Sequence, residues 1–291
     1  MKRLVLFVLT NLAILAMLSL VVRVTGIDSW LAARGMSLAS LLVMATLFGF
    51  AGSLLSLALS KWMAIRSLGV QRIEQPGSAG EQWLLETVQG LAQRAGVGRP
   101  EVGIFPAAQP NAFATGASRD HALVAVSSGL LAAMTREEME AVLGHELSHV
   151  ANGDMVTLAL LQGVLNTFVV LLSWLVGNIV DRSISRDTEG RGIGYMATVW
   201  LTQLVLGLLA TIVVMWFSRR REFRADAGGA RLAGRERMIA ALERLRRASA
   251  EPLPAHMDAF GITGGEGGWL ARLFMSHPPL QERIAALRAS S

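Results

Sequence analysis

The sequence contains no cysteine, and only one of its 291 residues, Tyr195, is a tyrosine. A chain without cysteine can form neither a disulfide bond nor a thiolate metal site. Any metal ion must therefore be held by histidine and carboxylate side chains. Charged residues are also scarce, at 17%, whereas 52% of the residues are hydrophobic and the mean hydropathy is +0.45. These values indicate a membrane protein that carries a soluble domain.

Charge is absent from four long apolar runs, at about residues 4–22, 37–60, 157–180 and 194–217. Each run approaches or exceeds the roughly 20 residues that a membrane-spanning helix needs. The alternative for the first run is a cleaved signal peptide, but the run is longer than the usual apolar segment of about 7–15 residues. Buried helices of a soluble protein are the alternative for the other three. We expect four spans.

Basic residues flank these spans unevenly. One side of the membrane has nine, namely Lys2, Arg3, Lys61, Arg66, Arg72, Arg219, Arg220, Arg221 and Arg224. The other side has five, namely Arg23, Arg34, Arg182, Arg186 and Arg191. The positive-inside rule places the side with nine in the cytoplasm. Because topology accounts for much of the basic charge, the pI of about 10.8 does not imply a nucleic-acid partner.

Four spans divide the chain into membrane and soluble parts that alternate. Residues 1–60 are expected to form two transmembrane helices, and residues 157–217 a transmembrane hairpin. The soluble domain is then assembled from two cytosolic pieces, residues 61–156 and 218–291, which the hairpin separates in the sequence.

Within the soluble pieces, hydrophobic periodicity predicts a helix over residues 80–96, with an apolar face of Trp83, Leu84, Val88, Leu91 and Ala92. Short strands are expected at residues 101–105 and 122–126, separated by a segment rich in turn formers. Thr135 and Glu138 have the spacing of a capping box, which predicts the start of a further helix. The later pieces are predicted as a charged helix (219–248), a glycine-rich loop (251–268) and a short helix begun by prolines in PPLQERIAALRA.

The helix that begins near Thr135 contains His145-Glu146-Leu147-Ser148-His149, an HExxH pattern. A spacing of four residues puts both imidazoles on one helical face, where they can bind one metal ion. Glu146 lies beside the first histidine and can take a proton from a metal-bound water and pass it to a leaving amine. The alternative is a pair of surface histidines that matched the pattern by chance.

A catalytic zinc ion usually has three protein ligands and an open fourth position. Glu222 and Asp226 lie one helical turn apart just after the fourth apolar run. We assign Glu222 as the third ligand and Asp226 as the acceptor of the other ring N–H of a ligating histidine. The alternative is that both carboxylates pair with nearby arginines on a solvated face.

Hydrolysis of a peptide bond also needs a donor for the developing oxyanion. Tyr195 cannot serve, because it begins the fourth span about 40 Å of helix from Glu222. Of the remaining histidines, His121, His256 and His277, we favour His277; an unrelated loop histidine is the alternative. Arg283 is expected to bond Asp226 or a substrate carbonyl.

Four segments resemble signatures of the HtpX heat-shock metalloproteases of bacterial inner membranes, which are relatives of the CAAX prenyl protease. They are GHELSHVANGD (144–154), NAFATG (111–116), SRRREFRADAGGA (218–230) and SHPPLQERIAAL (276–287). The resemblance implies that His145, His149 and Glu222 bind one Zn²⁺ and that Glu146 is the catalytic base.

The same resemblance implies a function and a place for the substrate. It implies endoproteolysis of misfolded or damaged membrane proteins on the cytoplasmic side of the bacterial inner membrane, with other membrane proteases as further partners. The NAFATG segment would flank the sheet edge that receives an extended peptide. An edge strand such as 122–126 would then pair with the substrate backbone, and Asn111 would bond it.

The expected fold is an α+β membrane protein with about four transmembrane helices. Its soluble part is a mainly helical, zincin-like (gluzincin) cytosolic domain with a small β-sheet. Two alternatives have other functions or architectures. One is a non-enzymatic membrane scaffold or transporter with a structural metal site; the other is a prenyl-protein-type protease with an intramembrane chamber, which would need more than four spans.

Overall fold

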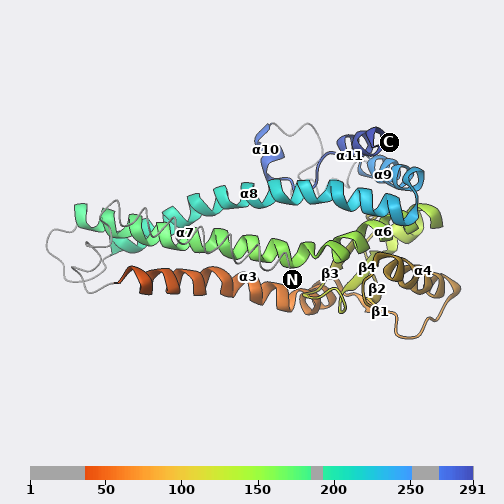
Figure 1. Ribbon diagram of the computed structural model, residues 1–291, viewed down its shortest axis with the longest axis horizontal. Helices are drawn as coiled ribbons and strands as arrows, with labels where there is room; N and C mark the ends of the chain where they lie inside the picture. The colour runs from red at the N-terminus through yellow and green to blue at the C-terminus, as the bar shows by residue number, and fades with distance from the viewer. Residues whose placement is uncertain (1–36, 185–192, 251–268, 291) are drawn as a thin grey trace. The chain divides into compact units, whose positions relative to one another are not determined.

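The computed structural model describes residues 37–184, 193–250 and 269–290, which form two compact units (Figure 1). The helical unit consists of the described residues up to Leu54 together with Leu160–Ala210. The mixed unit consists of Leu55–Ala159 and the described residues from Thr211 onward. The span predicted at residues 4–22 and the loop predicted at 251–268 lie outside the described residues.

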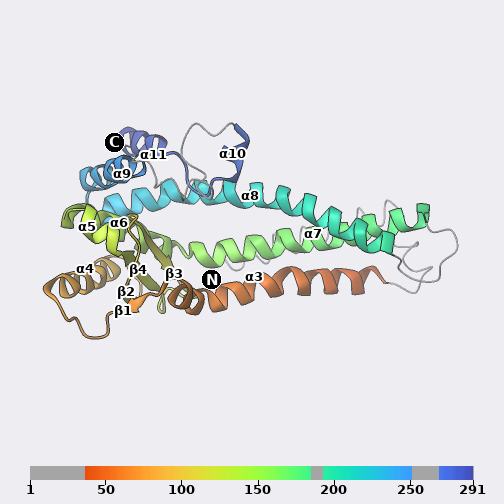
Figure 2. The same cartoon turned by 180° about the vertical axis from the view of Figure 1, so that it is seen from behind.

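Three long helices contain the other predicted spans, as Figures 1 and 2 show: α3 (Leu38–Leu68), α7 (Asp154–Ile184) and α8 (Ile193–Ala233). Within the described ranges, these three helices are long and apolar enough to cross a membrane. At ~1.5 Å per residue even the shorter ones are about 46 Å long, which exceeds the roughly 30 Å of a bilayer's hydrocarbon core. Each helix therefore has residues to spare beyond the apolar layer.

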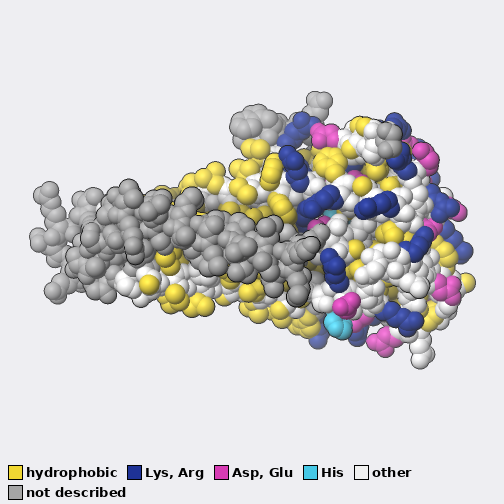
Figure 3. All heavy atoms as spheres, in the orientation of Figure 1, with side chains coloured by type: hydrophobic (Ala, Val, Ile, Leu, Met, Phe, Trp, Pro, Cys, Tyr) yellow, Lys and Arg dark blue, Asp and Glu magenta, His cyan; other side chains and the backbone are white. Residues whose placement is uncertain are grey.

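Small and apolar side chains hold α3 against α7 within the helical unit. Leu41 and Ala45 of α3 are buried with Leu171 and Leu175 of α7. The helices approach closely at Gly49, where an added Cβ atom would lie 2.5 Å from the backbone nitrogen of Thr167. On the face shown in Figure 3, the described surface of this unit is mostly hydrophobic. Helices that pack closely through small residues and present apolar side chains outward are suited to a lipid environment.

The mixed unit contains a four-stranded sheet in the order β1-β2-β4-β3. The strands are β1 (Gln71–Arg72), β2 (Glu101–Phe105), β3 (Ala112–Thr115) and β4 (Leu123–Ser127). β4 pairs in parallel with β2 and antiparallel with β3. The expectation that residues 122–126 form an edge strand is therefore wrong, because both sides of β4 carry hydrogen bonds; the edge strands are β1 and β3.

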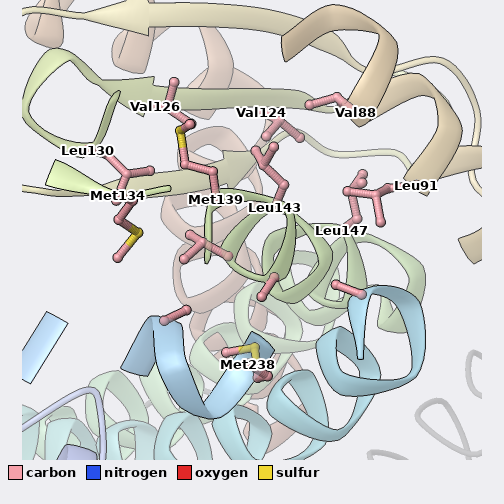
Figure 4. Packing of buried hydrophobic residues seen from close by; sticks show 14 of the residues in the cluster. Val88, Leu91, Val124, Val126, Leu130, Met134, Met139, Leu143, Leu147 and Met238 are labelled. Atoms are coloured by element: carbon pink, nitrogen blue, oxygen red, sulfur yellow. The ribbon is translucent and has the colours of Figure 1, made fainter. Parts of the chain in front are cut away.

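Four helices enclose the main core of the mixed unit: α4 (Ala79–Ala95), α6 (Arg136–Asn152), α9 (Arg235–Ala250) and α11 (Leu280–Ala289). Figure 4 shows Leu143 of α6 directed towards Val124 of β4, and Met238 of α9 on the other side of α6. Helix α6 is thus packed between the sheet and α9. Two short helices complete the unit, α5 (Ser128–Ala133) and α10 (Trp269–Phe274).

Both ends of α6 are fixed by local interactions. The predicted capping box is present: Thr135 Oγ1 accepts from the backbone N–H of Glu138, and Glu138 accepts from the backbone N–H of Thr135. At the other end Gly153 has φ +64°, a left-handed conformation that glycine adopts without strain. α7 begins at the next residue, Asp154. A helix fixed at both ends is a rigid support for the side chains that it carries.

The charged helix predicted over residues 219–248 is two helices. α8 runs without a break from the fourth apolar run to Ala233, and α9 begins at Arg235. Between them Gly234 has φ +105°, which only glycine adopts readily, and this residue ends α8. The residues after the span therefore continue the spanning helix itself.

We predict that Gly49→Ala destabilises the protein, because the added methyl group would meet the backbone of Thr167 at 2.5–2.7 Å. Overpacking of this kind costs about 1–3 kcal/mol, and a loss of that size lowers the melting temperature by several degrees, at roughly 2–4 °C per kcal/mol. The measurement is thermal unfolding of the purified protein in detergent. The matched control is Gly52→Ala in the same helix, where no described atom lies within 4 Å of an added Cβ. Equal melting temperatures for the two variants would contradict the prediction.

Candidate metal centre

Helix α6 presents two histidines to one point. His145 and His149 are one turn apart, and their Nε2 atoms are 3.2 Å from each other. The two rings are nearly perpendicular, with an interplanar angle of 88° and a centroid separation of 4.7 Å. Both side chains are largely buried, so neither is a solvated surface histidine.

Helix α8 brings Glu222 to the same point. One carboxylate oxygen of Glu222 lies 3.2 Å from Nε2 of His149, and the other lies 3.5 Å from Nε2 of His145. Asp226, one turn further along α8, lies 2.9 Å from Nδ1 of His145. Glu222 is 2% exposed and Asp226 is 1% exposed. The alternative in which these two carboxylates occupy a solvated face is therefore wrong.

Glycines allow α8 to come this close to α6. An added Cβ atom at Gly228 would lie 2.7 Å from Cβ of Ser148, and one at Gly229 would lie 3.0 Å from the backbone nitrogen of His145. Gly144 of α6 faces Gly229, with 3.4 Å between its added Cβ and the Cα of Gly229. A side chain at Gly228 or Gly229 would therefore push the helices apart and carry Glu222 away from the histidines.

A carboxylate accepts a hydrogen bond from the Nδ1 side of each histidine. Asp226 bonds His145 in this way, and Oδ2 of Asp154 lies 2.7 Å from Nδ1 of His149. Because a carboxylate attracts the ring proton to Nδ1, each Nε2 is left with a lone pair directed into the space between the rings. This arrangement would suit both imidazoles to bind a metal ion.

Asp154 was not assigned a role from the sequence, although it ends the GHELSHVANGD segment. It lies five residues after His149, beyond the helix, so no helical periodicity connects the two. The left-handed Gly153 turns the chain and brings the Asp154 side chain back to the histidine. A glycine followed by aspartate directly after the helix with the HExxH pattern was the available signal.

The donor atoms lie at spacings comparable to those around a tetrahedral zinc ion. Ligands at about 2.0–2.1 Å from such an ion lie about 3.3 Å apart; the two Nε2 atoms are 3.2 Å apart, and each lies 3.2 or 3.5 Å from a different oxygen of the Glu222 carboxylate. Without a metal ion, the two Nε2 atoms face each other at 3.2 Å with like groups, two lone pairs or two N–H groups, unless the rings differ in protonation. In addition, Oε2 of Glu222 is buried and makes no hydrogen bond of acceptable geometry with the described residues. His145, His149 and Glu222 therefore form a possible metal site.

The surrounding carboxylates favour protonation of both histidines. Burial opposes protonation of His149, but hydrogen bonds to Asp154 and Glu222 outweigh it and raise the pKa of His149 to about 9. The pKa of His145 is also raised, because Asp226 and Glu222 outweigh the effect of burial. The negative charge of Glu146 contributes to both shifts. A metal ion must therefore compete with protons for this pair.

Two residues from the last described segment complete the cluster. Arg283 of α11 donates two hydrogen bonds to Asp226, at 2.8 and 2.6 Å, so the expected contact between these residues is present. Nδ1 of His277 lies 2.8 Å from Oε2 of Glu222, and the His277 side chain is 63% exposed. The structure thus brings together His145, His149, Glu222, Asp226, His277 and Arg283, with Glu146 adjacent in sequence to His145.

Asn111 lies at a different part of the mixed unit, at the start of β3. Its backbone N–H donates to Oγ of Ser127, and its carbonyl accepts from the backbone N–H of Ser127. Its side chain is exposed. The residue is therefore fixed beside the edge strand and able to contact another molecule through its amide group.

Comparison with known proteins identifies relatives over the whole chain. Residues 78–291 match the profile described as Peptidase family M48. The protein named Protease HtpX homolog of Thiobacillus denitrificans is 61% identical over 289 residues, which cover 99% of each chain. The protein named Protease HtpX of Nitrosococcus oceani is 59% identical over 292 residues, again 99% of each chain.

One solved structure shares the fold. The crystal structure of S. mikatae Ste24p matches with a TM-score of 0.64 and 16% sequence identity, over 97% of this chain and 67% of that chain. At this identity the likeness concerns the fold alone.

We predict that Asp154→Asn weakens zinc binding by roughly 10- to 100-fold, because the amide no longer fixes the Nδ1 proton and the orientation of His149. The measurement is competition with a chromophoric chelator in detergent. Asp120→Asn is the matched control, since Asp120 is exposed. An unchanged zinc affinity for Asp154→Asn would show that this carboxylate does not support the ligand.

Proposed function

The chain belongs to peptidase family M48 and is a membrane-bound metalloprotease, and from this we propose a zinc-dependent endopeptidase that cleaves misfolded or damaged membrane proteins. The proposal places it in the bacterial inner membrane with four spans and with its catalytic domain, residues 61–156 and 218–291, in the cytoplasm. The observation that carries it is the convergence of His145, His149 and Glu222, with Glu146 next to His145 in the sequence.

We assign each residue of the cluster a chemical role. His145, His149 and Glu222 would hold the zinc ion, which when bound acidifies a water ligand and polarises the scissile carbonyl. Glu146 accepts the proton of the attacking water and donates it to the nitrogen of the leaving amine. Asp226 and Asp154 keep the ring protons on Nδ1 of the two histidines, so that each Nε2 stays a donor to the metal.

His277 and Arg283 have supporting roles in this proposal. The exposed His277 side chain lies beside the metal ligands, with Nδ1 2.8 Å from Oε2 of Glu222, and in the proposal a ring N–H of His277 donates a hydrogen bond to the developing oxyanion. Arg283 holds Asp226 through its two hydrogen bonds and lies 3.4 Å from Glu222, so it compensates the buried negative charge. The burial of Arg283 supports a role in positioning Asp226 over a direct contact with substrate.

The substrate backbone would pair with the free edge of β3. This strand bonds β4 on one side only and ends the sheet. An extended peptide that adds to such an edge is bound through main-chain hydrogen bonds, which are the same for every sequence. We propose that Asn111, at the start of β3, donates a further bond to the substrate, and that this mode of binding gives the broad tolerance that quality control requires.

A non-enzymatic scaffold or transporter has less support. The four apolar runs carry no charged residue, whereas ion and substrate pathways across a membrane usually depend on such residues. The family assignment also favours an enzyme.

We predict that Glu146→Gln lowers peptidase activity by roughly 10²- to 10⁴-fold, because the amide cannot accept the proton of water. The zinc content should stay at one ion per chain, since the substitution leaves the three ligands in place. Cleavage of unfolded casein in detergent and metal analysis measure the two quantities on the same preparation. Glu137→Gln, in the exposed first turn of α6, is the control for loss of a carboxylate. Full activity of zinc-loaded Glu146→Gln would overturn the proposed mechanism.

We predict that His277→Ala lowers kcat by about 10²- to 10³-fold with little change in KM, because an oxyanion donor acts mainly in the transition state. Steady-state kinetics with a fluorogenic peptide measure both constants. Ser276→Ala changes the neighbouring exposed residue and should leave them unaltered. If His277→Ala changed KM alone, the residue would bind substrate without stabilising the transition state.

A further inference from the structure

The end of α10 has an apolar surface that the enzyme site does not use. Phe274 is 44% exposed and the next residue, Met275, is 41% exposed. Two large adjacent apolar side chains are exposed on a segment that is itself held firmly. Nη1 of Arg219, on α8, donates to the carbonyl oxygens of Leu273 and Met275, at 3.3 and 2.7 Å. This apolar pair, Phe274 and Met275, is thus fixed at one level along α8.

Arg219, which fixes the apolar pair, lies just beyond the end of the apolar part of α8. From Ile193 to Trp216 the helix rises about 35 Å, which is the thickness of a bilayer's hydrocarbon core plus a few ångströms. Trp216 is exposed, and the guanidinium of Arg220 lies 5.0 Å from the centre of its ring. Tryptophan followed by a basic residue that reaches outward is the usual composition of a helix at the membrane interface.

Helix α3 supplies an independent indication of the same boundary. Trp62 is exposed, and Arg66 follows it at the same spacing of four residues that separates Trp216 from Arg220. From Leu38 to Trp62 α3 rises about 36 Å. Both helices therefore reach the interface after a similar length of apolar chain.

Arg219 lies less than one turn beyond Trp216, a rise of about 4.5 Å. The carbonyls that Arg219 binds, and with them the apolar pair, are consequently at the headgroup level. α10 projects from the side of α8 in both Figures 1 and 2. We propose that Phe274 and Met275 insert into the boundary between headgroups and acyl chains of the phospholipid bilayer.

The membrane contact has a consequence for the proposed active site, and this consequence rests on the proposed function. His277 follows Met275 by two residues and contacts Glu222, while Arg219, three residues before Glu222, holds Leu273 and Met275. α8 thus holds the segment 273–277 at two points less than one turn apart. Insertion of the apolar pair would restrict this segment further and keep the exposed His277 beside the metal ligands.

The absence of cysteine allows a direct test, because one introduced cysteine gives one labelled position. Phe274→Cys and Met275→Cys are labelled with a bimane fluorophore, in protein reconstituted into phosphatidylcholine–phosphatidylglycerol liposomes. Spin-labelled lipids with a nitroxide near the headgroup quench fluorophores at that depth. Trp216→Cys, an exposed position at the end of the apolar part of α8, is the positive control, and Gln281→Cys, exposed on α11, is the negative control.

We expect the shallow lipid quencher to reduce bimane emission clearly more at positions 274 and 275 than at position 281. Aqueous iodide should have the opposite preference and reduce emission more at position 281 than at positions 274 and 275. Emission at 274 and 275 that responds to iodide and not to the lipid quencher would overturn the proposal. Protection from both quenchers would also overturn it, because another part of the protein or a second copy would then cover the pair. The readout needs no proteolysis and can be made in the Glu146→Gln background, so failure of the proposed function would not affect it.

Discussion

The close backbone approach of α8 to α6 is the constraint on which the site depends. Gly144, Gly228 and Gly229 bring the two helices together so tightly that Glu222 and Asp226 reach the two histidines from the facing helix. The requirement is steric and leaves no room for even a methyl group at Gly228. The ligand geometry therefore depends on residues that carry no functional group and donate nothing to the metal.

The close packing of α8 against α6 buries more negative than positive charge. Glu222, Asp226 and Asp154 are buried together, and among the described residues Arg283 and Arg221 are the buried arginines beside them. Burying carboxylates is costly unless partners compensate them. Protonated histidines can supply the compensation, which explains the raised pKa values of His145 and His149. A divalent cation would supply the same charge and would leave both imidazoles neutral.

Local sequence signals predicted local structure well. The capping box at Thr135, the apolar face of α4 and the helix begun by Pro279 depend on neighbouring residues, and all three are present. The position of β3 at the sheet edge was missed because Ala112–Thr115 is short and lies among turn formers, while the apolar 122–126 segment had the stronger strand pattern. Asp154 was missed for a similar reason, since its contact with His149 depends on the turn at Gly153. The sequence could indicate which residue types were needed, but long-range packing decided which of them meet.

The bidentate contact between Arg283 and Asp226 joins positions 57 residues apart and belongs to the last described helix. A ribosome adds α6 and α8 to the chain well before it adds His277 and Arg283. During that interval Asp226 lacks its guanidinium partner and Glu222 lacks His277, so a nascent chain holds an incomplete and electrostatically strained cluster. The order of synthesis would thereby leave this cluster of buried charges without two of its partners until α11 has been made.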